Sequence, residues 1–276
     1  MLDFSHIVNS QQDIKIFYNT GTWQTWTRPR KCEYVYIICI GGGAGGSGGF
    51  IGTGRPGNGG GGGAITRGLF NSNLLPDDLY VNVGIGGKGG VSTSLGENAT
   101  KSYVSMRPNI TASNIILTSG NSAANNVSSE NIATIANMVF SSLGTFISTP
   151  GATVITENNI EPFDASVLTP GCSGGFYSGT TNLPGYSIIE TTISPLIEGG
   201  AAAVGSGNGG KGADGITSWK PFFSLGGAGG GGSYLGIGGN GGNGGFGSGG
   251  GNGGNGSVAG GKGGDGGDGL VIMIAF

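Results

Sequence analysis

A glycine pattern with the spacing of a phosphate-binding turn follows the most apolar stretch of the sequence. Gly41, Gly43 and Gly46 satisfy G-x-G-x-x-G directly after the run YVYIICI. In a dinucleotide-binding unit this turn opens a helix, and an acidic residue follows about 20 residues later to bind the ribose hydroxyl. The next residues, FIGTGRPGNGGGGG, are too rich in glycine for a helix, and no Asp or Glu occurs between Glu33 and Asp77. This context argues against a nucleotide site, and we expect no cofactor.

Side chains suited to acid–base or nucleophilic catalysis are scarce. His6 is the only histidine, and the carboxylates are few and scattered. A Ser-His-Asp or Cys-His arrangement would depend on that single histidine in an extended terminus. The sequence therefore predicts a protein that is not an enzyme.

The cysteines do not form a recognisable framework. Cys32 and Cys39 lie at odd separation on one expected strand, so they face opposite sides and cannot bridge each other. With Cys172 the count is odd, which argues against a disulfide set and against a zinc site. We expect buried free thiols, consistent with folding in a reducing cytoplasm.

One motif is similar to a calcium-binding repeat. GGDGGDGLV fits the β-roll pattern G-G-x-G-x-D-x-U-x, with Asp265 and Asp268 as the ligands. Such sites are built between tandem copies, and only one copy is present. We favour a solvated glycine-rich edge over a calcium site and expect no metal.

Charge and hydropathy limit the class of partner. A net charge of −3 is no electrostatic footprint for nucleic acid, and we interpret the short cluster Arg28, Arg30 and Lys31 as a solvated turn. No apolar run approaches the roughly 18 residues that span a membrane, so no membrane insertion is expected.

Aromatic residues inside or beside the glycine segments are the best candidates for contact with a partner. Rigid rings give a large contact area at little entropy cost, which suits binding of a receptor or glycan at loop tips. The alternative is that the rings fill gaps over the glycine segments. The receptor-contact candidates are Phe176, Tyr177, Trp219, Phe222, Phe223 and Tyr234.

The apolar patterns predict a mainly β protein with an antiparallel sandwich. The run at 34–40 is apolar on both faces, so that strand should be covered on both sides. One amphipathic α-helix is predicted at 128–144, with Ser128 or Ser129 as its cap and Gly144 at its end. The main predicted strands are 13–18, 31–40, 78–85, 101–106, 114–119, 151–156, 186–193 and 269–276.

The glycine tracts have a rhythm of three. Residues 226–269 hold 27 glycines in 44 positions without proline, and the other residues recur at every third position with one slip after Val258. This is the period of a polyproline-II-type helix, and the absence of proline favours polyglycine-II helices that hydrogen-bond side by side. Because ordering costs roughly 1–2 kcal/mol per residue, these helices must be clamped at their ends by apolar strands.

Three blocks of the sequence resemble the glycine-rich domain of bacteriophage tail fibre and tail-tip adhesin proteins. They are GTWQTWTRPRKCEYVYIICIGGGAGGSGG, LYVNVGIGGKGGVSTSLG and GGKGGDGGDGLVIMIAF, in the family's order. The resemblance implies a β-sandwich that clamps a bundle of polyglycine-II helices, with distal loops that contact a bacterial surface receptor. The departure is residues 97–200, which are poor in glycine and carry the predicted helix.

Three regions and two functions follow as expectations. Residues 1–96 hold the first strands and glycine segments, 97–200 an inserted β/α region, and 201–276 the second glycine segments and closing strand. The resemblance implies a virion protein of the tail, assembled in the host cytoplasm, that binds a host receptor or glycan and contacts other virion proteins through residues 1–20. It leaves a homo-oligomer open. The alternative is a purely structural connector or decoration protein of the tail or baseplate.

Overall fold

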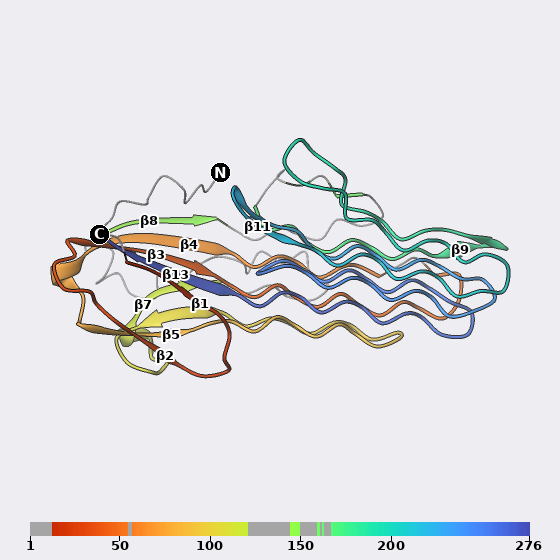
Figure 1. Cartoon of the computed structure of the whole chain (residues 1–276). Coiled ribbons are helices and arrows are strands. Elements are labelled where there is room, and N and C mark those ends of the chain that lie inside the picture. Colours follow the sequence, from red (N-terminus) through yellow and green to blue (C-terminus); the bar gives the residue numbers. More distant parts are fainter. Residues whose placement is uncertain (1–12, 55–56, 121–143, 150–158, 161, 163–166) are drawn as a thin grey trace.

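The computed structural model describes residues 13–54, 57–120, 144–149, 159–160, 162 and 167–276. In this part of the chain, antiparallel sheets lie at one end of an elongated molecule, and extended glycine-rich segments run side by side away from them (Figure 1). Short 3₁₀ helices occur at Ser72–Leu74 (η1) and Ala112–Asn114 (η2), and the described residues contain no α-helix. The strands are β1 Asp13–Phe17, β2 Gln24–Thr27, β3 Tyr34–Ile40, β4 Ile65–Asn71, β5 Asp78–Asn82, β6 Ser102–Ser105, β7 Ile115–Ser119, β8 Gly144–Thr149, β9 Tyr177–Ser178, β10 Thr181–Asn182, β11 Thr217–Trp219, β12 Phe222–Ser224 and β13 Leu270–Ala275. The prediction of a mainly β, antiparallel protein is confirmed.

The larger sheet is built around the most apolar strands. Its order is β1-β13-β3-β4-β8, and every pairing is antiparallel. The second sheet has the order β2-β5-β6-β7. Two pairs of short antiparallel strands, β9 with β10 and β11 with β12, lie outside these two sheets.

Both faces of β3 are buried, as its sequence predicts. Val35, Ile37 and Cys39 join the core that the two sheets share, together with Trp26 of β2 and Val104 of β6. The alternate residues of β3 face a second core, which covers the other side of the larger sheet. That core is formed by Ile38, Ile40, Ile65, Leu168, Phe222, Leu270, Ile272 and Ile274.

The strand predictions are confirmed for β1, β3, β5, β6, β7 and β13, with ends that shift by up to a few residues. The predicted strand at 186–193 is wrong, because only Ile188 forms isolated bridges, to Ile160 and Ile197. Strand β4 was not predicted, since Arg67 and Gly68 interrupt its apolar pattern. The predicted strand at 151–156 lies outside the described residues, as does the predicted helix at 128–144 except for Gly144, which begins β8.

The glycine-rich segments form what we call the bundle, and backbone hydrogen bonds join its members at every third residue. The N–H groups of Gly250 and Gly253 donate to the carbonyls of Ala44 and Ser47, at 3.0 and 2.9 Å. The intervening residues donate to other neighbours, so each segment is bonded in several directions. The bundle comprises residues 41–49, 58–64, 83–100, 168–176, 183–188, 197–203, 208–216, 225–232, 238–245, 248–256 and 259–269.

Segment 248–256 lies in the middle of the bundle. Besides segment 41–49, it donates to residues of 168–176 and 238–245, and its carbonyls accept from residues of 58–64, 225–233 and 259–269. Gly249 to Gly256 are all buried. A strand of a sheet is bonded only to its left and right, whereas this segment is bonded around its whole circumference.

The G-x-G-x-x-G stretch is part of this bundle. The N–H groups of Gly43, Gly46 and Gly49 donate to the carbonyls of residues 267, 264 and 261, at 2.8–2.9 Å. No helix follows in the described residues up to β4. Residues 41–49 are thus hydrogen-bonded side by side with other glycine-rich segments and form no phosphate-binding turn before a helix.

Candidate functional site at the tip of the bundle

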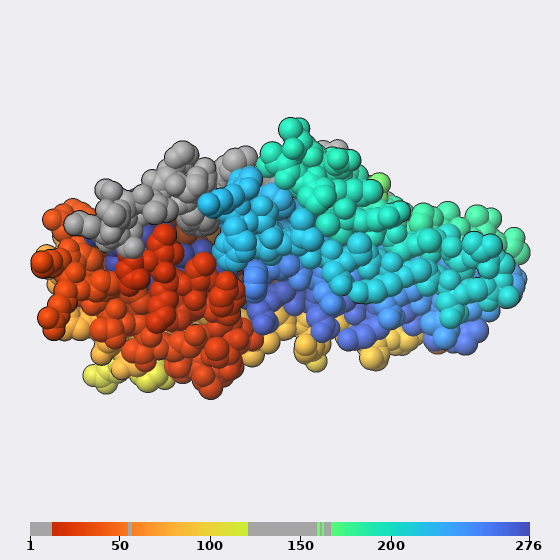
Figure 2. Space-filling view, viewed as in Figure 1, coloured from red at the N-terminus to blue at the C-terminus, as the bar shows by residue number. Residues whose placement is uncertain are grey.

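The turns at the far end of the bundle form one surface, which we call the tip. It consists of residues 50–54, 178–182, 203–207, 233–237 and 256–259, at the end opposite the sheets (Figure 1). Figure 2 shows the molecule tapering toward this end. Two reversals use glycine in the left-handed region, Gly179 with φ +60° and Gly205 with φ +58°, which other residues rarely adopt.

Side-chain amides hold the tip turns together. Asn255 is fully buried; its Oδ1 accepts from the Phe50 N–H at 2.9 Å, and its Nδ2 donates to the Gly54 carbonyl at 2.6 Å. Asn182 acts in the same way, because its Oδ1 accepts from the Tyr234 N–H and its Nδ2 donates to the Ala203 carbonyl. A side-chain amide can accept and donate at the same time, so each of these two side chains hydrogen-bonds to two backbone groups of other tip residues. The tip turns are thereby held in a single arrangement.

Large apolar side chains project from these turns. The exposed fractions are 57% for Ile51, 54% for Leu235 and 63% for Val258. No Asp, Glu, Lys or Arg occurs among the residues that define the tip. A group of exposed apolar side chains on a rigid surface is typical of a contact site for another macromolecule. We call this group the tip patch; its members are Phe50, Ile51, Val204, Leu235, Ile237 and Val258.

The six predicted contact aromatics do not come together. Phe176, Tyr177 and Tyr234 lie near the tip, where the rings of Tyr177 and Tyr234 meet edge to face at 5.5 Å. Tyr234 and Phe176 are partly exposed, but Tyr177 is buried.

The other three aromatics lie where the bundle joins the sheets. Phe222 and Phe223 are 1% and 3% exposed and belong to two apolar cores. Trp219 is partly buried, with its ring 5.7 Å from Phe222 and 6.4 Å from Phe246. The rings of Tyr177, Phe222 and Phe223 are thus buried in the fold, whereas those of Phe176, Trp219 and Tyr234 are partly exposed.

The tip patch was missed because its residues are mostly aliphatic and isolated. Ile51, Leu235, Ile237 and Val258 stand in short interruptions of the glycine tracts, in GGFIGT, GSYLGIGG and GSVAGG. The sequence signal for the tip patch was the apolar residue in each of these three short interruptions. Where a turn is exposed, such a residue has no core to enter.

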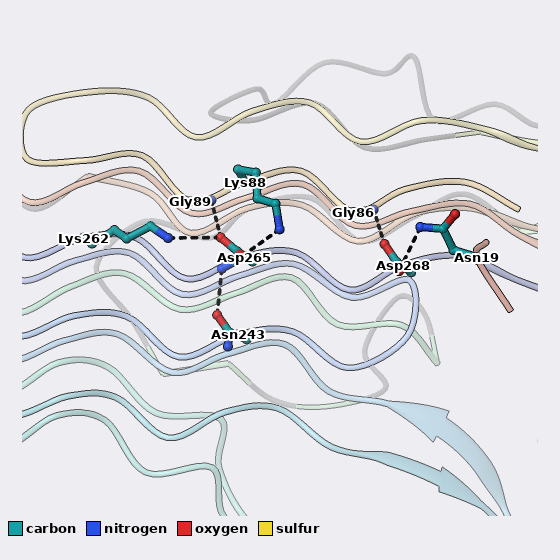
Figure 3. A network of polar contacts seen from close by, with 8 residues as sticks. All are labelled: Asn19, Gly86, Lys88, Gly89, Asn243, Lys262, Asp265 and Asp268. Carbon is teal, nitrogen blue, oxygen red and sulfur yellow. Dashed lines mark hydrogen bonds and ion pairs between the residues drawn. The ribbon is translucent and has the colours of Figure 1, made fainter. Parts of the chain in front are cut away.

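Asp265 completes the hydrogen bonding of an edge of the bundle (Figure 3). Its Oδ1 accepts from the backbone N–H of Gly89 at 2.8 Å, and Lys88 Nζ lies 3.1 Å from its Oδ2. Partial burial raises the pKa of this carboxyl, but the hydrogen bonds from Gly89 and Lys88 and the charge of Lys262 outweigh burial, so the pKa lies below its usual range. The carboxylate takes the place of the carbonyl that a further bundle segment would supply.

Asp268 has the same role one turn further along. Its Oδ1 accepts from the Gly86 N–H at 2.8 Å, and its Oδ2 accepts from Asn19 Nδ2 at 3.1 Å. Asn243 also caps an N–H at this edge, that of Asp265, at 2.9 Å. The two calcium candidates thus bind backbone and side-chain donors, and the described residues contain no group of three or more His, Cys, Asp or Glu that could hold a metal ion.

The remaining sequence-based sites have simple outcomes. Cys39 and Cys172 are buried free thiols, as predicted, and burial raises the pKa of both well above the usual range. His6 lies outside the described residues. Among the helices that the structure describes, none has the length and apolar character to cross a membrane.

Comparison with known proteins agrees with the glycine-rich character of the chain. A search of the curated proteins found no match. The family model described as a glycine-rich domain matches residues 18–276, which include the whole described bundle and every described strand except β1. The chain belongs to this glycine-rich domain family.

Proposed function

We propose that this chain is a non-enzymatic bacteriophage virion protein, a tail fibre or tail-tip adhesin that binds a host surface receptor through its tip. The observation that supports it best is the tip patch, a set of exposed apolar side chains at the end of an elongated molecule. The three sequence blocks that resemble phage adhesins give the biological setting. The localisation in the tail follows from the same resemblance.

We also propose that the bundle consists of polyglycine-II helices. Three features support this: the bonding to one neighbour at every third residue, the bonding of segment 248–256 around its circumference, and the absence of internal bonds along it. Close packing requires the glycines. A Cβ atom on Gly249 or Gly260 would lie 1.8 Å from the carbonyl oxygen of Gly60 or Gly49.

The bundle suits presentation of a binding surface because both of its ends are constrained. At one end β3, β4 and β13 continue directly into segments 41–49, 58–64 and 259–269. At the other end, the amides of Asn182 and Asn255 join the turns. A surface that is ordered before binding loses less conformational entropy when it meets its receptor.

Replacement of tip-patch residues tests the proposal. We expect the double variant Ile51→Ser and Leu235→Ser to lower binding of the purified protein to host cells by about tenfold or more. Two apolar side chains that become buried at the centre of an interface can each contribute over about 1 kcal/mol to the binding free energy. Ile110→Ser is the matched control, since Ile110 is 65% exposed but lies beside η2, among the sheets. Binding through the tip patch should also change little with salt, because its six described side chains carry no charge to be screened.

Two results would contradict the adhesin. One is a purified protein that does not bind host cells. The other is an antibody that covers the tip on the virion without blocking adsorption. If labelling then places the protein among other tail or baseplate proteins, the structural connector replaces the adhesin.

A further inference from the structure

The turn between β2 and β3 carries a surface with different chemistry at the opposite end of the molecule. Residues 28–32 of this turn separate two cavities of about 360 and 290 Å³. We call this surface the basal site. The larger cavity is lined by Thr27, Arg28, Pro29, Arg30, Lys31, Cys32, Ser72, Asn73 and Asp77, and the smaller one by Pro29, Arg30, Lys31, Cys32, Ala275 and Phe276.

The turn is braced from both sides. The guanidinium of Arg28 donates to the carboxylate of Asp77 at 2.5 Å and to the carbonyl of Ser72. The hydroxyl of Ser72 in turn donates to the carbonyl of Cys32 at 2.5 Å, and the N–H of Glu33 donates to the carbonyl of the last residue at 2.8 Å. Arg28 is therefore a structural brace, and its charge is already paired.

Arg30 and Lys31 have no such role. Both side chains are exposed, and neither has a hydrogen-bond or ion-pair partner among the described residues. Lys31 has φ +70°, a left-handed conformation that is uncommon outside glycine and is held here by the braces on either side. The turn thus presents two unpaired cations in a fixed orientation between two cavities.

An apolar wall completes the smaller cavity. The ring of Phe276 stacks on that of Tyr34, with centroids 6.1 Å apart and planes 28° apart. Both residues remain about two-fifths exposed, at 41% and 40%. Cations beside an exposed aromatic wall suit a ligand that carries carboxylates next to an apolar side chain.

We propose that the basal site binds an acidic peptide segment of a partner protein, with carboxylates at Arg30 and Lys31 and an aromatic or aliphatic side chain against Phe276. A nucleic acid fits less well, because the whole chain carries a net charge of −3 and Glu33, Asp77 and Asp78 flank the cations. An extended polyanion would meet these carboxylates, whereas a short peptide can place its charges between them. This inference does not depend on what the tip binds, since it concerns the other end of the molecule.

Fluorescence anisotropy with the full-length protein tests the basal site. The probe is a labelled peptide, Asp-Glu-Phe-Glu-Asp between glycines, and its matched controls are the amide form Asn-Gln-Phe-Gln-Asn and the basic form Lys-Arg-Phe-Arg-Lys. We expect the acidic peptide to bind more tightly than either control. The double variant Arg30→Glu and Lys31→Glu should weaken that binding by about tenfold or more. Lys211→Glu with Lys262→Glu, which reverses two charges in bundle segments 208–216 and 259–269 that line neither cavity, should leave it within about twofold.

The results are decisive in either direction if each variant keeps the thermal unfolding midpoint of the parent protein. Loss of peptide binding only in the Arg30 and Lys31 variant supports the site. A second readout is amide hydrogen exchange, in which the peptide should slow exchange at residues 28–34 and not at the tip. No binding of the acidic peptide, or equal binding by both double variants, overturns the proposal. An oligothymidylate probe tests the nucleic-acid alternative. If it binds more tightly than the acidic peptide, and the Arg30 and Lys31 variant loses that binding, the basal site is assigned to nucleic acid instead.

Discussion

Substitution of Gly251 by alanine tests the packing of the bundle most directly. A Cβ atom on Gly251 would lie 2.0 Å from the carbonyl oxygen of Ala228 and 2.6 Å from its carbon. That carbonyl accepts a hydrogen bond from Gly242, whose own carbonyl accepts from Gly251. Three backbones therefore meet where the methyl group would point, and none of them has a flexible side chain to move aside. The central segment must shift away from segment 225–232.

The cost of that shift follows from the bonds it breaks. Three hydrogen bonds join the central segment to residues 225–233, donated by the N–H groups of Gly227, Gly230 and Ser233. If each contributes about 1 kcal/mol and overpacking adds about 1–3 kcal/mol, the free energy of unfolding falls by about 4–6 kcal/mol. This is a large part of the roughly 5–15 kcal/mol that a domain possesses.

Chemical unfolding followed by circular dichroism measures this difference. Gly54→Ala is the matched control, because a Cβ there has nothing within 4 Å. It should be neutral or stabilising by up to about 1 kcal/mol, through the unfolded state. If Gly251→Ala is within about 0.5 kcal/mol of the parent protein, the close lateral packing inferred for the bundle is refuted.

Three further outcomes are expected. Asp265→Asn should retain most of the stability of the parent because an amide oxygen can still accept the backbone N–H, whereas Asp265→Ala should lose about 1 kcal/mol in urea unfolding. Folding lowers the pKa of Asp265, so its carboxylate stabilises the protein fully above the unfolded pKa of about 3.9 and progressively less as the pH falls below that value. Asp265→Asn should therefore flatten the acid limb of the stability–pH curve. An unchanged acid limb would contradict the stabilising role of the ionised carboxylate. Asn255→Ala leaves the partly buried Phe50 N–H without its acceptor, so it should cost about 1 kcal/mol and speed amide exchange in the 50–54 turn. Unchanged exchange would show that the amide does not hold the tip. A thiol reagent should modify the partly exposed Cys32 first and leave Cys39 and Cys172 unmodified until the protein unfolds. Early labelling of all three thiols would contradict the burial of Cys39 and Cys172.

The strands of the sheets were largely predictable because their signal is local. In β3 and β13, runs of branched and aromatic residues give long apolar stretches, and both strands lie where predicted. Strand β4 was not predicted, because Gly68 and Arg67 interrupt its apolar pattern and it becomes a strand through its pairing with β3 and β8. The six aromatic candidates show the same limit. Ring type does not say whether a residue such as Phe222 lies in a core or at a surface.

The sequence by itself determined the period of the bundle. Gly-Gly pairs at every third position leave a backbone that can approach its neighbours, and interrupting residues such as Asn240, Asn243 and Lys262 lie at an exposed edge. It also determined that the bundle needs apolar strands at its ends, since glycine loses more backbone entropy on ordering than any other residue.

Only the tertiary structure decided which segments lie side by side. Backbone N–H and C=O groups are the same at every glycine, so no side chain specifies that segment 248–256 bonds to 41–49 on one side and to 238–245 on another. The choice is made by the strands to which the segments are attached and by the few side chains, such as Asn252 and Asn255, that are buried between them. The tip patch and the basal site arise in the same way, because each is assembled from turns that are far apart in the sequence and come together only when the bundle and the sheets are complete.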